Sequence, residues 1–154
     1  MMKKYFLLLF FFSVFIQDIY SQSNTTHLNL NSKNIAVDGY DLVSYFEENK
    51  AVPGKKNFKY TFEGGNYYFA SEKHLNNFKK SPQNYLPSFG GWCAYAMGKT
   101  GEKVKIDPKS FIVNGNELYL FYDSMFNDTR EKWNNSSVNL EQKAKINWKK
   151  LTSD

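Results

Sequence analysis

The chain has 154 residues, of which 42% are hydrophobic and 18% aromatic, so it can close one core of ordinary size but hardly two. Its formal net charge is +5, but the Lys and Arg residues are scattered among Asn, Ser and acidic residues and form no basic run. We therefore expect one domain and no nucleic-acid partner.

The first 23 residues predict a cleavable secretory signal. Residues 1–4 carry two lysines, an apolar run of twelve residues follows over 5–16, and small residues surround a cut after Ser21 or Ser23. The run is shorter than the roughly 20 apolar residues that a membrane-spanning helix needs. We therefore expect an exported protein, periplasmic or secreted, with no membrane span once the signal is removed.

After the signal, residues 24–34 are rich in Asn, Ser and Thr and predict a flexible lead-in to a domain over residues 35–151. That domain opens with a short strand over 35–37 and a short helix or turn over 40–46. Apolar and polar residues then alternate over 58–63, which predicts a strand with one buried face. Gly64-Gly65 suits a tight hairpin turn to a partner strand over 66–69.

Two short helices are predicted next. Ser71 is well placed to cap a helix that runs to about Lys80 and turns Leu75 and Phe78 inward. A second short helix is expected over 92–97, after the double glycine 90–91. It would place Cys93 and Met97 on one face, because residues four apart are neighbours on a helix.

The C-terminal third predicts strands, a hairpin and a helical tail. Strands are expected over 104–106, 111–113 and 116–122, the last two joined by an Asn-Gly turn. A helix is expected over 124–133, followed by a second one whose apolar stripe should dock on the sheet: Leu140, Ala144, Trp148 and Leu151. The whole pattern predicts an α+β fold, a small antiparallel sheet built from hairpins with short helices packed on it and a C-terminal amphipathic helix.

These motifs together resemble the YHS domain, a small module named after its recurring residues. The resemblance rests on Asp41-Leu42-Val43, Tyr67-Tyr68-Phe69, Ser71, Phe78, Pro82 and Tyr85. The continuation over residues 90–96 and the Asn-Gly hairpin are similar to exported single-domain members, and the resemblance spans about residues 35–148. It implies an α+β fold. It also implies metal binding, because cysteine-bearing YHS domains occur in copper-transporting ATPases and are thought to hold copper or another metal.

The metal ligands implied by that resemblance are carried over only in part. The cysteines of metal-binding members correspond to Ser44, Ala70 and His74 here, and only His74 keeps coordinating capacity. The chain offers His74 with its single cysteine, Cys93, and with Met97 as a third ligand. Imidazole, thiolate and thioether form a soft set suited to Cu(I). Copper is therefore the metal expected if a site exists.

Three other interpretations stay open. His74, Cys93 and Met97 are also compatible with plain core packing. Cys93 at the start of a helix could instead be a reactive thiol in a redox protein, with His74 exchanging its proton. The abundant Tyr and Trp could form an interaction or small-molecule-binding surface without any metal. A non-enzymatic protein is expected on balance, and a cleft lined by Tyr with His74 and Cys93 far apart would favour the binding module.

Overall fold

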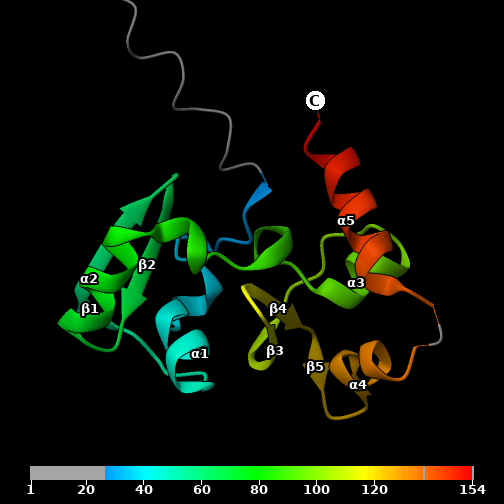
Figure 1. The fold of residues 1–154 in the computed structure, drawn as a ribbon, viewed down its shortest axis with the longest axis horizontal. Helices are drawn as coiled ribbons and strands as arrows, with labels where there is room; N and C mark the ends of the chain where they lie inside the picture. Colours follow the sequence, from blue (N-terminus) through cyan, green and yellow to red (C-terminus); the bar gives the residue numbers. More distant parts are fainter. Residues whose placement is uncertain (1–26, 137, 154) are drawn as a thin grey trace, which may run out of the picture.

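The computed structural model describes residues 27–136 and 138–153, and it confirms the α+β class. The predicted signal over 1–23 lies outside the described residues. Within the described part, the strands form three separate two-stranded antiparallel hairpins instead of one continuous sheet. Figure 1 shows two groups of elements side by side along the longest axis, one built from the earlier part of the chain and one from the later part.

The first group is a hairpin covered by two helices (Figure 1). Its elements are the 3-10 turn η2 (Val37–Gly39), α1 (Leu42–Glu48), β1 (Lys55–Phe62), β2 (Gly65–Phe69), α2 (Glu72–Lys80) and the 3-10 turn η3 (Pro82–Asn84). The predicted hairpin is confirmed, with Phe62 paired to Gly65 at the turn. Ser71 caps α2 by accepting a hydrogen bond from the His74 N–H, and Phe78 is fully buried. Phe78 packs on Tyr67 and Phe69 of β2, which fixes α2 against the hairpin.

The second group begins where the chain crosses the molecule at residue 87. It consists of η4 (Ser88–Gly91), α3 (Ala94–Lys99), β3 (Asp107–Asn114), β4 (Glu117–Phe121), β5 (Asp123–Ser124), β6 (Asn127–Asp128), α4 (Thr129–Asn134) and α5 (Leu140–Leu151). Pro87 makes a parallel bridge to Leu118 of β4, which ties the crossing segment to the second group. Helix α5 lies against α3 (Figure 1). It comes so close that a Cβ at Gly98 would lie 2.6 Å from the Leu140 carbonyl oxygen.

Several predicted boundaries in this chain were wrong. Residues 104–106 form no strand, and residues 35–37 make isolated bridges and the start of η2. The β3–β4 turn is formed by Gly115 and Asn116, between the paired Asn114 and Glu117. Residues 123–128 form the β5–β6 hairpin where a helix was expected, because Asp128 caps α4 and so begins the helix later. The α5 stripe packs on α3 as well as on β4.

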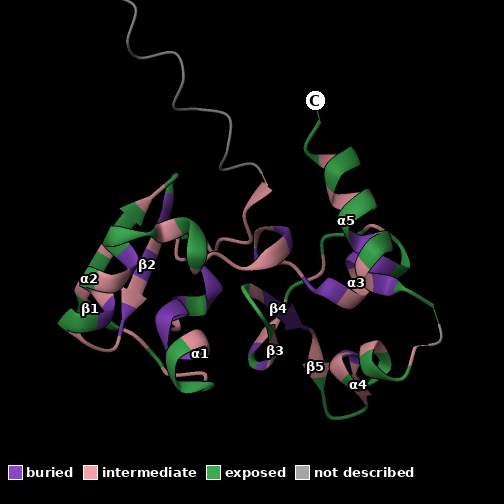
Figure 2. Ribbon diagram, in the orientation of Figure 1, coloured by how far each residue is buried: buried purple, intermediate pink, exposed green. Residues whose placement is uncertain are grey.

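Both groups of elements contain buried residues (Figure 2), and these form two hydrophobic clusters, of which the first joins the two groups. The first contains the buried faces of α1, β2 and α2 together with Leu118 and Leu120 of β4. The second gathers Phe89, Met97, Tyr119, Phe121 and Ala144 around α3 and α5. Strand β4 thus contributes to both clusters with alternate side chains. Among the described residues there is no helix both long and apolar enough to span a membrane.

Candidate functional site

His74 is held in the first turn of α2 by a buried carboxylate. Its Nδ1 lies 2.6 Å from Oδ2 of Asp41, and its Nε2 lies 3.4 Å from Oε1 of Glu48. Asp41 is fully buried at the start of α1, where Oδ1 accepts from the backbone N–H groups of Val43 and Ser44. Its Oδ2 also accepts from the Ala70 N–H at 2.8 Å. Asp41 therefore joins α1, the end of β2 and α2 in one hydrogen-bonded unit.

This unit occupies the positions at which the metal-binding relatives carry cysteines. The Ser44 hydroxyl lies 2.7 Å from the Asp41 carbonyl oxygen and 2.8 Å from that of Lys50, so it is already engaged with the backbone. Ala70 has no donor atom in its side chain. The residues present at these three positions therefore do not fit the metal that the resemblance implies, and the Asp41–His74 pair connects the segments instead.

Cys93 and Met97 lie in the second group of elements. The Cys93 side chain is buried, with Sγ 3.5 Å from Thr129 Oγ1 and accepting from the Tyr122 N–H at 3.3 Å. Met97 is buried among the apolar side chains of the second cluster. Helices α2 and α3 stand at opposite ends of the view in Figure 1. Cys93 thus shares none of its hydrogen-bond partners with His74, and no group of three or more His, Cys, Asp or Glu able to hold a metal ion occurs among the described residues.

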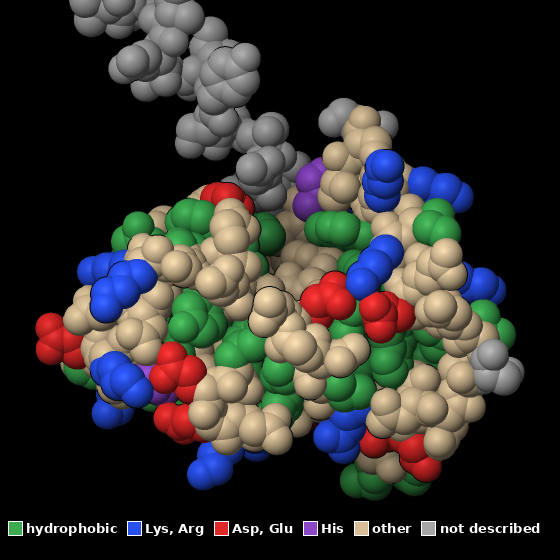
Figure 3. Space-filling view, in the orientation of Figure 1, with side chains coloured by type: hydrophobic (Ala, Val, Ile, Leu, Met, Phe, Trp, Pro, Cys, Tyr) green, Lys and Arg blue, Asp and Glu red, His purple; other side chains and the backbone are tan. Residues whose placement is uncertain are grey.

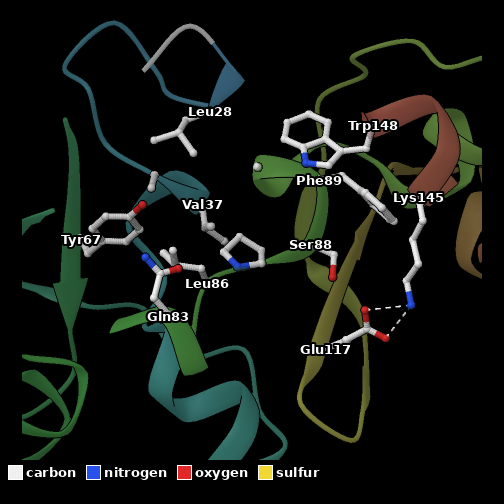
Figure 4. Close-up of a pocket in the computed structure, with 13 residues that line it drawn as sticks. Leu28, Val37, Tyr67, Gln83, Leu86, Ser88, Phe89, Glu117, Lys145 and Trp148 are labelled. Carbon is white, nitrogen blue, oxygen red and sulfur yellow. Dashed lines mark hydrogen bonds and ion pairs between the residues drawn. The ribbon is translucent and has the colours of Figure 1, made fainter. Parts of the chain in front are cut away.

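A cleft of about 390 Å³ opens between the two groups of elements. In the space-filling view it is the hollow in the upper centre of the molecule, with acidic and basic side chains on its right-hand rim (Figure 3). Figure 4 shows Leu28, Val37, Tyr67 and Leu86 on one wall. The facing wall carries Phe89 and Trp148, and Glu117 and Lys145 lie at its lower end.

The upper part of the cleft is built by close contact of the N-terminal segment with η4. The Asn29 N–H donates to the Gly90 carbonyl oxygen at 2.8 Å, and the Asn29 side chain donates to that of Gly91 at 2.9 Å. Gly90 has φ of +60°, and a Cβ there would lie 2.7 Å from the His27 carbonyl oxygen and 2.9 Å from the Trp148 ring. Glycine at this position therefore allows the segment and the ring to meet.

Two residues of the cleft walls have a strained backbone. Val37 and Phe89, on opposite walls, have φ of +49° and +56°. Residues with bulky or β-branched side chains rarely adopt this left-handed backbone, and such strain clusters at binding sites. Both side chains are buried, so the surrounding packing holds them in place.

Tyr67 supplies a polar group of the cleft that is available to a ligand. The residue is only 3% exposed, and its hydroxyl makes no hydrogen bond to another described residue. Among the described side chains, the buried polar atom without a partner is Ser110 Oγ, so the Tyr67 hydroxyl keeps contact with solvent. Burial, with a smaller effect of Glu63, raises the pKa of Tyr67 to about 12, so the hydroxyl keeps its proton at neutral pH. A ligand that displaces water from the cleft could therefore form a hydrogen bond with this hydroxyl.

The charged groups of the cleft are already paired. Lys145 Nζ lies 3.0 and 3.1 Å from the two carboxylate oxygens of Glu117 and 2.7 Å from Glu141. Burial opposes ionisation of Glu117, but hydrogen bonds from the Tyr119 hydroxyl and Lys145 outweigh it and lower its pKa. This end of the cleft is therefore a closed ionic network.

The geometry defines an α+β protein with a ligand-sized cleft between a hairpin–helix unit and a C-terminal extension. Residues 43–88 match the family model of the YHS domain, so this segment of the chain is a YHS domain. The match contains most of α1, the β1–β2 hairpin and α2, and it ends at the first residue of η4. No curated protein and no solved structure gives a significant match to the chain.

Sequence reasoning considered a cleft lined by tyrosine but did not find its residues. Tyr67 was identified only as part of a strand motif, and Trp148 as part of a helix stripe. The usable signals were the double glycine at 90–91 and the apolar stripe on α5.

Proposed function

We propose that this YHS-domain protein binds a small molecule in the cleft between its two groups of elements. The observation that carries the proposal is a 390 Å³ cleft whose wall presents the Tyr67 hydroxyl, which has no hydrogen-bond partner among the described residues. A concave, mostly apolar site with a few convergent polar groups is the usual form of a ligand pocket. The two strained residues on its walls, Val37 and Phe89, add support.

Binding is favoured over thiol chemistry by the identity of the lining residues. The titratable side chains among the described residues that line the cleft are Tyr67, Glu117 and Lys145. Cys93 is buried among Thr129 and Tyr122, away from this lining. A redox function would need a reagent to reach that sulfur.

The test is a small-molecule screen by thermal denaturation, followed by NMR mapping of the residues that respond. Ser88→Phe should fill the cleft and abolish the stabilisation by any hit, while Ser124→Phe, on the exposed β5–β6 hairpin, should leave it intact. Hits that shift resonances of Phe89 and Trp148 support the proposal. A library without hits, or hits that bind Ser88→Phe equally well, would contradict it.

Copper binding through His74, Cys93 and Met97 is the competing proposal. It is inherited from the family, in which metal handling by cysteine-bearing members is suspected. It is weakened here because the Nδ1 of His74 is engaged by Asp41 and Met97 is enclosed in an apolar cluster. Titration of the purified protein with Cu(I), compared with His74→Ala and Cys93→Ala, decides it: tight stoichiometric binding lost in both variants would establish the metal site.

Export is also part of the proposed function. The charged start and apolar run of residues 1–16 support a cleaved signal, which would leave a periplasmic or secreted binding protein. Mass spectrometry of the protein from a secreting host should give a mature N-terminus near residue 22 or 24. Recovery of the uncut chain from the cytoplasm would rule the signal out.

A further inference from the structure

We propose, building on the proposed ligand cleft, that its ligand is an uncharged ring compound whose hydroxyl or carbonyl oxygen forms a hydrogen bond with Tyr67. Three features of the cleft carry this assignment: the pairing of its charges, the composition of its walls, and the placement of its unpaired polar groups.

The pairing of charges disfavours an ionic ligand. Among the described lining residues, Glu117 and Lys145 are the ones with ionised side chains, and they bind each other. Lys145 is further held by Glu141, and Glu117 accepts from the Tyr119 hydroxyl at 2.8 Å. A ligand carboxylate or ammonium would have to break this network or lose hydration without a partner, and either is costly.

The walls suit a flat, rigid body. Phe89 and Trp148 meet edge to face, with ring centroids 6.3 Å apart, and His27 lies edge-on to Trp148 at 6.1 Å. The opposite wall is made of the aliphatic side chains of Leu28, Val37 and Leu86 (Figure 4). Aromatic walls held in place by neighbouring rings favour ring compounds, because stacking then requires little reordering of side chains.

The unpaired polar groups set the orientation of the ligand. Besides the Tyr67 hydroxyl, the Ser88 hydroxyl and the Trp148 indole N–H make no hydrogen bond to another described residue, and both line the cleft. Each can donate, and each hydroxyl can also accept. An apolar ring carrying one oxygen can therefore bury its body against the walls and satisfy Tyr67, whereas a pure hydrocarbon leaves that hydroxyl unpaired.

The experiment uses four compounds that share one bicyclic skeleton: 2-naphthol, naphthalene, 2-naphthoate and 2-naphthylmethylammonium. Their affinities for the purified protein are measured by calorimetry at pH 7. We expect 2-naphthol to bind about five-fold more tightly than naphthalene, since one net hydrogen bond is worth roughly 1 kcal/mol. Both ions should bind more weakly than 2-naphthol.

The matched variants are Tyr67→Phe and Tyr68→Phe. Tyr67→Phe removes a hydroxyl without a partner among the described residues, so it should leave the melting temperature unchanged, lower 2-naphthol affinity to the naphthalene level and leave naphthalene binding unaltered. Tyr68, the next residue of β2, lies outside the cleft lining, and Tyr68→Phe should change nothing.

The outcomes separate the ligand class from the cleft itself. Tightest binding by either ion, or 2-naphthol affinity that is insensitive to Tyr67→Phe, would overturn the ligand class while leaving a binding cleft. Failure of these compounds together with the whole library to bind would overturn the proposed function as well. Loss of 2-naphthol affinity in Tyr67→Phe alone supports the inference.

Discussion

Replacing Asp41 by alanine should be among the most damaging single changes to this fold. The substitution removes one carboxylate that accepts from three backbone N–H groups and from His74 Nδ1. Loss of a helix cap costs about 1 kcal/mol. Two further donors, the part-buried Ala70 N–H and the buried His74 ring, would lose their acceptor at about 1–3 kcal/mol each. We therefore expect a loss of about 3–7 kcal/mol, a large part of the roughly 5–15 kcal/mol typical of a domain.

The chain supplies a matched control at the start of α4. Asp128 accepts from the N–H groups of Arg130 and Glu131 in the same way, but its side chain is 32% exposed and forms no hydrogen bond with a histidine among the described residues. Urea unfolding followed by tryptophan fluorescence should give about 1 kcal/mol for Asp128→Ala. If Asp41→Ala lowers the free energy of unfolding by a similar amount, burial and the bonds to Ala70 and His74 do not make Asp41 more important than Asp128. The double variant Asp41→Ala/His74→Ala should lose less stability than the sum of the two single variants, because both substitutions remove the same interaction.

Three further results are expected. Gly90→Ala should lower the melting temperature and speed hydrogen exchange at the Asn29 N–H, because the new Cβ would clash with the His27 backbone. Gly115→Ala is the control, since Gly115 has a similar φ of +59° but open space around it, so that its effect comes from conformational strain alone. Equal effects of the two substitutions would exclude the clash. Cys93 should react with a thiol reagent only in urea, since its side chain is buried; rapid reaction of the native protein would revive the redox interpretation. The pKa of Glu117 is lowered in the folded state, so its carboxylate should stabilise the protein above the unfolded pKa near 4.5 and lose that contribution as the pH falls further. The difference in melting temperature between the native chain and Glu117→Gln should therefore shrink below pH 4.5. A difference that stays constant would argue against the ionic network.

Local signals in the sequence were enough for the elements that local chemistry determines. Alternation placed the β1–β2 hairpin, and the Ser71 cap placed the start of α2. The β5–β6 hairpin was missed because its two-residue strands are too short to show an alternation of apolar and polar residues. At the hairpin tip, Met125 and Phe126 are 89% and 92% exposed.

The site depends on contacts that no local pattern encodes. His74 and Asp41 are 33 positions apart in the sequence, and nothing in the local sequence around either residue predicts their contact. The cleft brings Leu28, Tyr67, Phe89 and Trp148 together from four separate segments. Single-sequence reasoning could name these residues as apolar or aromatic, but their meeting point follows from the crossing of the chain at Pro87 and from the approach of α5.

Residue 87, where the chain crosses from one group of elements to the other, lies close to the end of the segment that matches the YHS family model, and residues on both sides of it line the cleft. Tyr67 and Leu86 fall inside the segment that defines the family, whereas Trp148 and Lys145 come from the extension beyond it. A chain that kept the matched module and lost α5 would lose Lys145 and Trp148 from the wall of the cleft. The proposed ligand site therefore depends on the last helix as well as on the module that matches the family model.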